Sequence, residues 1–168
     1  VCIGDSDGDG LADILTNHVT AGSLDEQMAW IPSLTPSNAT ILHIPAMNPA
    51  CPVSYHAKML YRDVNNDGKK DIVVRGLFAY NSTNGQLIND DGSILIDYGP
   101  NFTTGKCIQQ AVPQNGSAFG VSFDLGDVNR DGFVDIVGAA PSYHLSVFDP
   151  YSTTSKDGRV TIVYGPDF

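Results

Sequence analysis

The fold is decided by a nine-residue stretch that occurs three times in the 168 residues: DSDGDGLAD at residues 5–13, DVNNDGKKD at 63–71 and DVNRDGFVD at 127–135. The copies begin 58 and 64 residues apart. A second stretch repeats in the same order, since DGSILIDYGPNF at 91–102 returns as DGRVTIVYGPDF at 157–168. Two motifs that recur in one order indicate repeated structural units.

The segments between these motifs predict β-structure. They are short runs of β-branched and aromatic residues separated by Gly, Pro, Asn and Ser, and no stretch has a sustained helical period. A repeat of about 60 residues with four such runs has the size of a propeller blade, which is a four-stranded antiparallel sheet. We therefore predict an all-β fold of about three β-propeller blades, each with its Asp-rich loop between the first two strands. The second motif forms the third strand, and an outer fourth strand is expected near residues 39–44 and 106–112.

The repeats are assigned to residues 1–50, 51–113 and 114–168, which together form one partial propeller domain. Closed propellers have about four to eight blades, so three blades do not complete a ring. We expect the first repeat to be truncated at its N-terminus and the third to lack its outer strand. Neighbouring chain or further copies of the protein would then supply the missing part.

The negative charge of the chain is concentrated in the three Asp-rich loops. The net charge is −10, and ten of the 19 acidic residues lie in these loops, so the other nine balance the nine Lys and Arg residues. Carboxylates this close in sequence repel one another unless a cation lies among them. The alternative is a general acidic face for basic partners.

The pattern of each loop predicts a calcium site. Calcium takes six to eight oxygen ligands, and a loop with oxygen-bearing side chains at positions one, three and five can surround it if the backbone turns sharply at position six. Position six is Gly10, Gly68 or Gly132. Position seven would contribute its carbonyl oxygen, and the Asp at position nine is expected to bind through both carboxylate oxygens. The predicted ligands are Asp5, Asp7, Asp9, Leu11 and Asp13; Asp63, Asn65, Asp67, Lys69 and Asp71; and Asp127, Asn129, Asp131, Phe133 and Asp135.

Other metals and other loop types fit this pattern less well. The absence of Cys and His from the ligand positions argues against zinc, copper and iron, and magnesium prefers to keep its waters. An EF-hand needs a Glu at position twelve, where this chain has Thr16, Val74 and Gly138. Dockerin modules have a similar loop, but they are helical and repeat at a shorter interval. A plain Asp-Gly hairpin turn remains the alternative for any single loop.

The glycosylation sequons favour a secreted glycoprotein. Four Asn-x-Ser/Thr sequons occur, at Asn38, Asn81, Asn101 and Asn115. The cysteines are Cys2, Cys51 and Cys107, so at most one disulfide forms within the chain. Neither spacing nor count fixes the pairing, and Cys51 with Cys107 is the candidate pair. No run of about 18 apolar residues could cross a bilayer.

The third repeat resembles an FG-GAP repeat of the integrin α-subunit propeller and its calcium-binding relatives. The resemblance rests on four elements in order, namely Phe119-Gly120, the loop at 127–135, the GAAP sequence at 138–141 and the strand motif at 158–165. The second repeat has Arg75-Gly76-Leu77 in place of Gly-Ala-Pro and has no Phe-Gly. The resemblance implies a scaffold in which calcium ions brace loops on one face while other faces bind partners.

No catalytic motif accompanies these repeats. The four histidines are scattered, at positions 18, 43, 56 and 144, and neither a phosphate-binding loop nor a basic patch is present. The carboxylates are unsuited to a glycosidase, because an active site is needed once and these occur three times.

We expect a non-catalytic extracellular module, secreted or at the cell surface, that binds protein or glycan ligands and no nucleic acid. The alternatives are a structural unit of an extracellular filament or coat, and an accessory propeller of a secreted enzyme.

Overall fold

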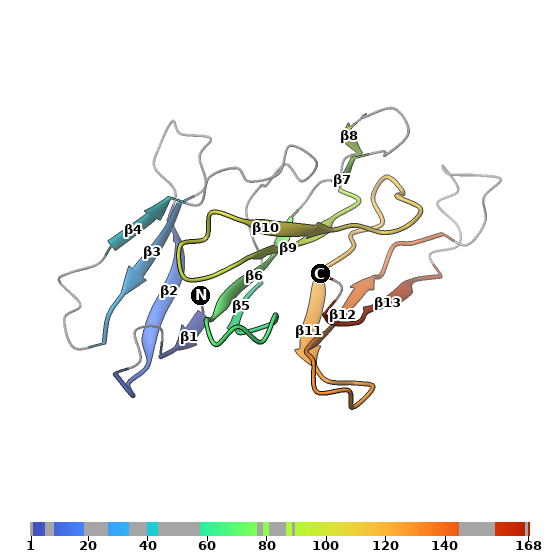
Figure 1. Cartoon of the computed structure of the whole chain (residues 1–168). Coiled ribbons are helices and arrows are strands. Elements are labelled where there is room, and N and C mark those ends of the chain that lie inside the picture. The colour runs from blue at the N-terminus through green and yellow to red at the C-terminus, as the bar shows by residue number, and fades with distance from the viewer. Residues whose placement is uncertain are drawn as a thin grey trace.

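The computed structural model describes residues 2–5, 9–18, 27–33, 40–43, 58–76, 79–80, 87–88, 90–144, 157–166 and 168. In this part of the chain the regular secondary structure is entirely β-strand. The strands form small antiparallel sheets that lie side by side (Figure 1). This confirms the predicted all-β class with blade-like sheets, and within the described residues the sheets do not close into a ring.

The first sheet has four strands in chain order, and each pairs with the next. Its fourth strand lies within residues 39–44, where the sequence predicts an outer strand. The strands are β1 Cys2–Gly4, β2 Asp13–His18, β3 Gln27–Ile31 and β4 Thr40–His43.

The second sheet repeats this plan in the order β5-β6-β9-β10. Its strands are β5 Met59–Arg62, β6 Asp71–Gly76, β9 Ser93–Asp97 and β10 Gly105–Ile108. Between β6 and β9 the chain adds a short hairpin, β7 Ala79–Tyr80 with β8 Leu87–Ile88, which the sequence did not indicate.

The third sheet has the order β11-β12-β13. Its strands are β11 Ser122–Gly126, β12 Asp135–Ala140 and β13 Arg159–Val163. Within the described residues β13 pairs with β12 alone. The residue boundaries assigned to the three repeats stay predictions.

The same pairing closes each Asp-rich loop. The Asp at position nine is the first residue of the second strand, and it pairs with the residue that precedes position one: Gly4 with Asp13, Arg62 with Asp71, and Gly126 with Asp135. Each loop therefore connects two neighbouring antiparallel strands. Figure 1 shows the second and third loops, and the described ends of the first, at the end of the molecule opposite β7 and β8.

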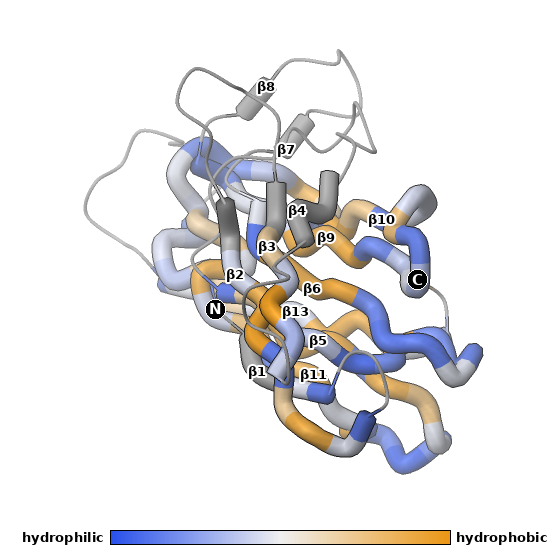
Figure 2. The backbone as a smooth tube through the Cα atoms, turned by 90° about the vertical axis from the view of Figure 1, so that its left-hand side faces the viewer, coloured by the Kyte–Doolittle hydropathy of each residue, from blue (hydrophilic) through white to orange (hydrophobic). Residues whose placement is uncertain are grey.

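Two apolar clusters hold neighbouring sheets together. Leu15 of the first sheet packs with Ile72, Val74 and Leu95 of the second. On the other face of the second sheet, Ile94 and Ile96 pack in a cluster with Phe123 and Ile136 of the third sheet and with Phe119, which precedes β11. Because side chains alternate between the two faces of a strand, β9 contributes Leu95 to one cluster and its two neighbours to the other. Figure 2 shows hydrophobic residues along β6 and hydrophilic residues in the turns.

Candidate metal-binding loops

The backbone of each loop makes the sharp turn that the sequence predicts. The φ angles of Gly10, Gly68 and Gly132 are 86°, 81° and 89°, a region that non-glycine residues rarely adopt. Asn66 and Arg130, at position four of the second and third loops, also have positive φ angles of 61° and 64°. Position four was not singled out in the sequence, although Gly8 and Asn66 are residues that tolerate this conformation.

The acidic side chains at positions one and five fold back over this turn. In every loop the N–H of position six donates to the carboxylate of position one, and the N–H of position seven donates to the carboxylate of position five. The first contact measures 3.1, 2.9 and 3.0 Å in Gly10–Asp5, Gly68–Asp63 and Gly132–Asp127. The second measures 2.7, 2.7 and 2.8 Å in Leu11–Asp9, Lys69–Asp67 and Phe133–Asp131. The three loops thus share one hydrogen-bonded frame.

Position three joins this frame in the second and third loops. Asn65 Oδ1 accepts a hydrogen bond from the N–H of Asp67 at 3.1 Å, and Asn129 Oδ1 accepts one from the N–H of Asp131 at 3.0 Å. The amide nitrogens of these two asparagines donate to the carboxylates at position five, at 3.2 and 2.8 Å. Asp7, the equivalent residue of the first loop, lies outside the described residues.

The Asp at position nine occupies a different environment. Asp13, Asp71 and Asp135 are all buried. Asp71 accepts hydrogen bonds from the N–H groups of Val64 and Gly99, both at 2.9 Å. Asp135 repeats this arrangement with the N–H groups of Val128 at 2.8 Å and Gly165 at 3.0 Å, and Asp13 accepts the N–H of Ser33 at 2.9 Å. Position nine therefore ties the loop to the end of the third strand, a role that the sequence did not suggest. Its predicted role as a bidentate calcium ligand stays a prediction.

Burial raises the pKa of Asp71, and the nearby charges of Asp67 and Asp63 raise it further, while the hydrogen bonds from Val64 and Gly99 oppose the shift. Burial is the largest cause of this shift, and the repulsion from Asp67 and Asp63 is a smaller one. A cation bound among these carboxylates would offset their mutual repulsion.

Two side chains connect the loops to one another. Asn66 Nδ2 of the second loop donates to the carbonyl oxygen of Gly132 in the third at 3.3 Å. Lys70 Nζ of the second loop donates to the carbonyl oxygen of Asp5 in the first. The three acidic loops therefore lie next to one another at one end of the sheets, in agreement with Figure 1.

The oxygen atoms of the loops suit a calcium ion. Asp63 Oδ1 is buried and has no hydrogen-bond partner, which leaves an acceptor oxygen at position one of the second loop available to a cation. The side chains at positions one, three and five offer oxygen donors, as calcium prefers. Within the described ranges, however, no three Asp, Glu, His or Cys side chains form a ready metal-binding group, because position nine is directed at backbone N–H groups and position three is Asn in two loops. The donor chemistry thus fits calcium, with positions one, three and five as the side chains that would hold it.

The remaining predicted sites lie away from the loops. Asn101 and Asn115 are exposed, as a glycan requires, whereas Asn38 and Asn81 lie outside the described residues. Cys107 is disulfide-bonded. The predicted partner Cys51 also lies outside the described residues, so this pairing stays a prediction.

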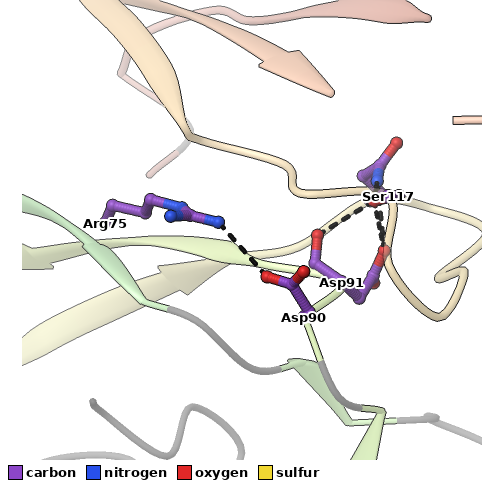
Figure 3. A network of polar contacts seen from close by, with 5 residues as sticks. Arg75, Asp90, Asp91 and Ser117 are labelled. Atoms are coloured by element: carbon purple, nitrogen blue, oxygen red, sulfur yellow. Dashed lines mark hydrogen bonds and ion pairs between the residues drawn. The ribbon is translucent and has the colours of Figure 1, made fainter. Parts of the chain in front are cut away.

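A buried polar network joins the turn before β9 to residues 110–117, and no sequence motif predicts it. Asp91 Oδ1 accepts hydrogen bonds from Ser117 Oγ at 2.6 Å, from Gln114 N at 2.9 Å and from Gln110 Nε2 at 3.2 Å. Beside it, Arg75 of β6 forms an ion pair of 3.6 Å with Asp90 (Figure 3). Burial raises the pKa of Asp91, and the three hydrogen bonds oppose the shift. Asp91 therefore joins the turn before β9 to the segment that leads into the third sheet.

Comparison with known proteins identifies one of the three repeats. Residues 119–163 match the FG-GAP repeat, and this range contains the third loop together with Phe119-Gly120 and β11 to β13. The chain thus contains an FG-GAP repeat within a set of blade-like sheets. FG-GAP repeats often bind calcium and are typically extracellular and non-catalytic. None of the curated proteins matches the chain. In the part of the chain that the structure describes, no helix is long and apolar enough to cross a membrane.

Proposed function

We propose that this chain is a non-catalytic, calcium-binding extracellular module that holds three calcium ions, one in each Asp-rich loop. The observation that carries the proposal is the frame of hydrogen bonds shared by the three loops, in which N–H groups of positions six and seven fix the carboxylates of positions one and five. The same frame in three repeats supports the same ligand in each.

Calcium would supply the positive charge that the loops lack. In the second loop the side chains of Asp63, Asn65 and Asp67 would hold the ion, and the buried Oδ1 of Asp63 would gain a partner. Each loop joins two strands and adjoins the next loop, so the filled loops would form a rigid edge across the sheets. This edge, or the neighbouring turns, would serve to bind an extracellular protein or glycan.

Two features support the extracellular location. A disulfide at Cys107 is typical of oxidising compartments. The sequons at Asn101 and Asn115 are exposed, so glycans could be attached there without disturbing the core.

Thermal unfolding of the metal-free chain, with and without calcium, tests the proposal. A ligand that binds only the folded state stabilises it by mass action, so the melting temperature should rise by several degrees in excess calcium. Magnesium at the same concentration should have a smaller effect, because it gives up its waters less readily. Equal melting temperatures in calcium and in excess chelator, for a chain shown to be metal-free, would contradict the proposal.

A further inference from the structure

One peptide group of the third loop is held from two sides. The peptide between Gly132 and Phe133 donates its N–H to the carboxylate of Asp131 at 2.8 Å. Its carbonyl oxygen accepts a hydrogen bond of 3.3 Å from Asn66 Nδ2, which belongs to the second loop. Because a peptide group is planar, a contact that orients its carbonyl also orients its N–H. Asn66 is therefore connected, through one rigid peptide, to the side chain at position five of the third loop.

Asn66 lies between two of the residues proposed to hold calcium in its own loop. Asn65 and Asp67 occupy positions three and five, and Asn65 Oδ1 accepts the N–H of Asp67 at 3.1 Å. The φ angle of Asn66 is 61°, in a region that residues other than glycine adopt infrequently. An ion held by Asn65 and Asp67 would also fix the backbone between them. Position four of the second loop thus responds to its own ion and has a side chain that reaches the next loop.

Two comparable residues lack this combination. Arg130 occupies position four of the third loop with a φ of 64°, but within the described ranges it makes no hydrogen bond to another loop. Lys70 of the second loop reaches the carbonyl oxygen of Asp5 in the first, but it brings a positive charge that opposes a cation nearby. Asn66 is neutral, so its contact orients the third loop without repelling an ion.

We propose that calcium binding in the second loop strengthens calcium binding in the third, through the hydrogen bond from Asn66 to Gly132. This coupling rests on the proposed function, because it takes calcium as the ligand of both loops. An ion in the second loop orders Asn66, which then holds the peptide after Gly132 with its N–H toward Asp131. The third loop is thereby partly ordered before its own ion arrives, so it loses less conformational entropy on binding.

The coupling is reciprocal, since two linked binding sites change each other's affinity by the same factor. Asn66 acts as a positioning residue, because its side chain contacts the peptide of the neighbouring loop and not an ion. The second and third loops would then fill together over a narrower range of calcium concentration than two independent loops.

Calcium titration of the isotope-labelled full chain, followed by NMR, tests the coupling. The amide signals of Gly68 and Gly132 report the second and third loops separately, because each N–H donates to the carboxylate at position one of its own loop. Asp63→Ala disables the second loop, and loss of the calcium response at Gly68 checks that this loop is empty. The measured quantity is the calcium concentration at the midpoint of the Gly132 response with the second loop disabled, divided by the midpoint with the second loop intact.

Asn66→Gly removes the hydrogen bond to Gly132 and permits the same positive φ angle. It should lower this ratio of midpoints by about two- to tenfold, the factor that corresponds to the net free energy of one hydrogen bond. Repulsion between the two ions lowers the ratio in wild type and variant alike, so it does not affect the comparison. Arg130→Gly is the matched control: it changes the third loop's own affinity whether or not the second loop is filled, and it should leave the ratio unchanged.

Failure of the coupling can be told apart from failure of the proposed function. If neither Gly68 nor Gly132 responds to calcium in the wild type, the proposed function is wrong and the coupling is overturned with it. If both respond but the ratio is the same in wild type and Asn66→Gly, the calcium sites stand and the coupling alone is overturned. An equal change of the ratio in Asn66→Gly and Arg130→Gly would also overturn it, because position four would then act without the contact between the loops.

Discussion

The carboxylate of Asp135 accepts a hydrogen bond of 3.0 Å from the backbone N–H of Gly165, although 30 residues separate them in the sequence. The same carboxylate accepts a second hydrogen bond from the N–H of Val128 within its own loop. Asp135 thus connects the third Asp-rich loop to the end of β13, and Asp71 connects the second loop to the end of β9 in the same way. These hydrogen bonds therefore couple the conformation of each loop to the packing of its sheet.

Replacing Asp135 by Asn should affect both stability and calcium binding. The Asn side chain keeps one oxygen that can accept a hydrogen bond, but its NH2 group replaces the other oxygen. One of the two backbone N–H groups therefore loses its partner, at a cost of about 1–3 kcal/mol. This loss should appear in excess chelator, measured by urea unfolding. If position nine is also a calcium ligand, the calcium content should fall from three ions to two.

Asp131→Asn is the matched control for this experiment. Asp131 is exposed and belongs to the same loop, so its substitution should weaken calcium binding while leaving the stability of the metal-free chain within about 0.5 kcal/mol of wild type. Equal stability of both variants in chelator would show that the buried hydrogen bonds of Asp135 are not needed.

Asp91 should make the stability of the fold depend on pH. Burial raises its pKa in the folded state, so the folded protein binds this proton more readily than the unfolded chain does. The contribution of Asp91 to stability is therefore complete below the ordinary value of 3.8 and is lost as the pH rises through the raised folded pKa. Asp91→Asn removes the buried charge and keeps an acceptor for Ser117, so it should stabilise the protein at neutral pH.

Urea unfolding of wild type and Asp91→Asn at a series of pH values measures this effect. The advantage of the variant should shrink as the pH is lowered toward 3.8. Asp91→Ala, which removes the acceptor of Ser117, Gln114 and Gln110, should instead lose about 1–3 kcal/mol at every pH. A constant difference between wild type and the Asn variant across this range would disprove a raised pKa at Asp91.

Gly92 should tolerate no side chain. Its φ angle is 84°, and a Cβ at this position would fall on the carbonyl oxygen of Phe119, where the second and third sheets meet. Gly92→Ala should therefore cost more than about 2 kcal/mol in urea unfolding, since it combines backbone strain with a clash. Gly116 has a φ of 77° with open space around it, so Gly116→Ala should cost only the strain of about 1–2 kcal/mol. Equal losses in the two variants would refute the clash with Phe119.

Asn101 and Asn115 should carry glycans when the protein comes from its native source, because both are exposed sequons. Intact mass before and after glycosidase treatment measures the occupancy, and substitution of each Asn by Gln locates it. A single unmodified mass would contradict the extracellular location.

The features that the sequence could predict are those with a local cause. Gly68 and Gly132 turn their loops through positive φ, and the β-forming residues within 39–44 predict the strand β4. The contacts between residues far apart in the sequence could not be predicted, because no local pattern indicates them. Asp135 looked like one more loop carboxylate, because its partner at Gly165 is brought close only by the pairing of β12 with β13. Asp91 is the first residue of the motif predicted to form the third strand, and its hydrogen bond with Ser117 depends on how a segment 26 residues away in the sequence folds against it.

The calcium content of the purified chain tests the central claim most directly. The chain is equilibrated with calcium, the free ion is removed by dialysis against trace calcium, and bound calcium is measured by elemental analysis against protein concentration. Three loops with one hydrogen-bonded frame predict three ions per chain, and two ions after Asp63→Ala, which removes position one of the second loop. A wild-type chain that retains no calcium, or an Asp63→Ala variant that retains all three ions, would contradict the account.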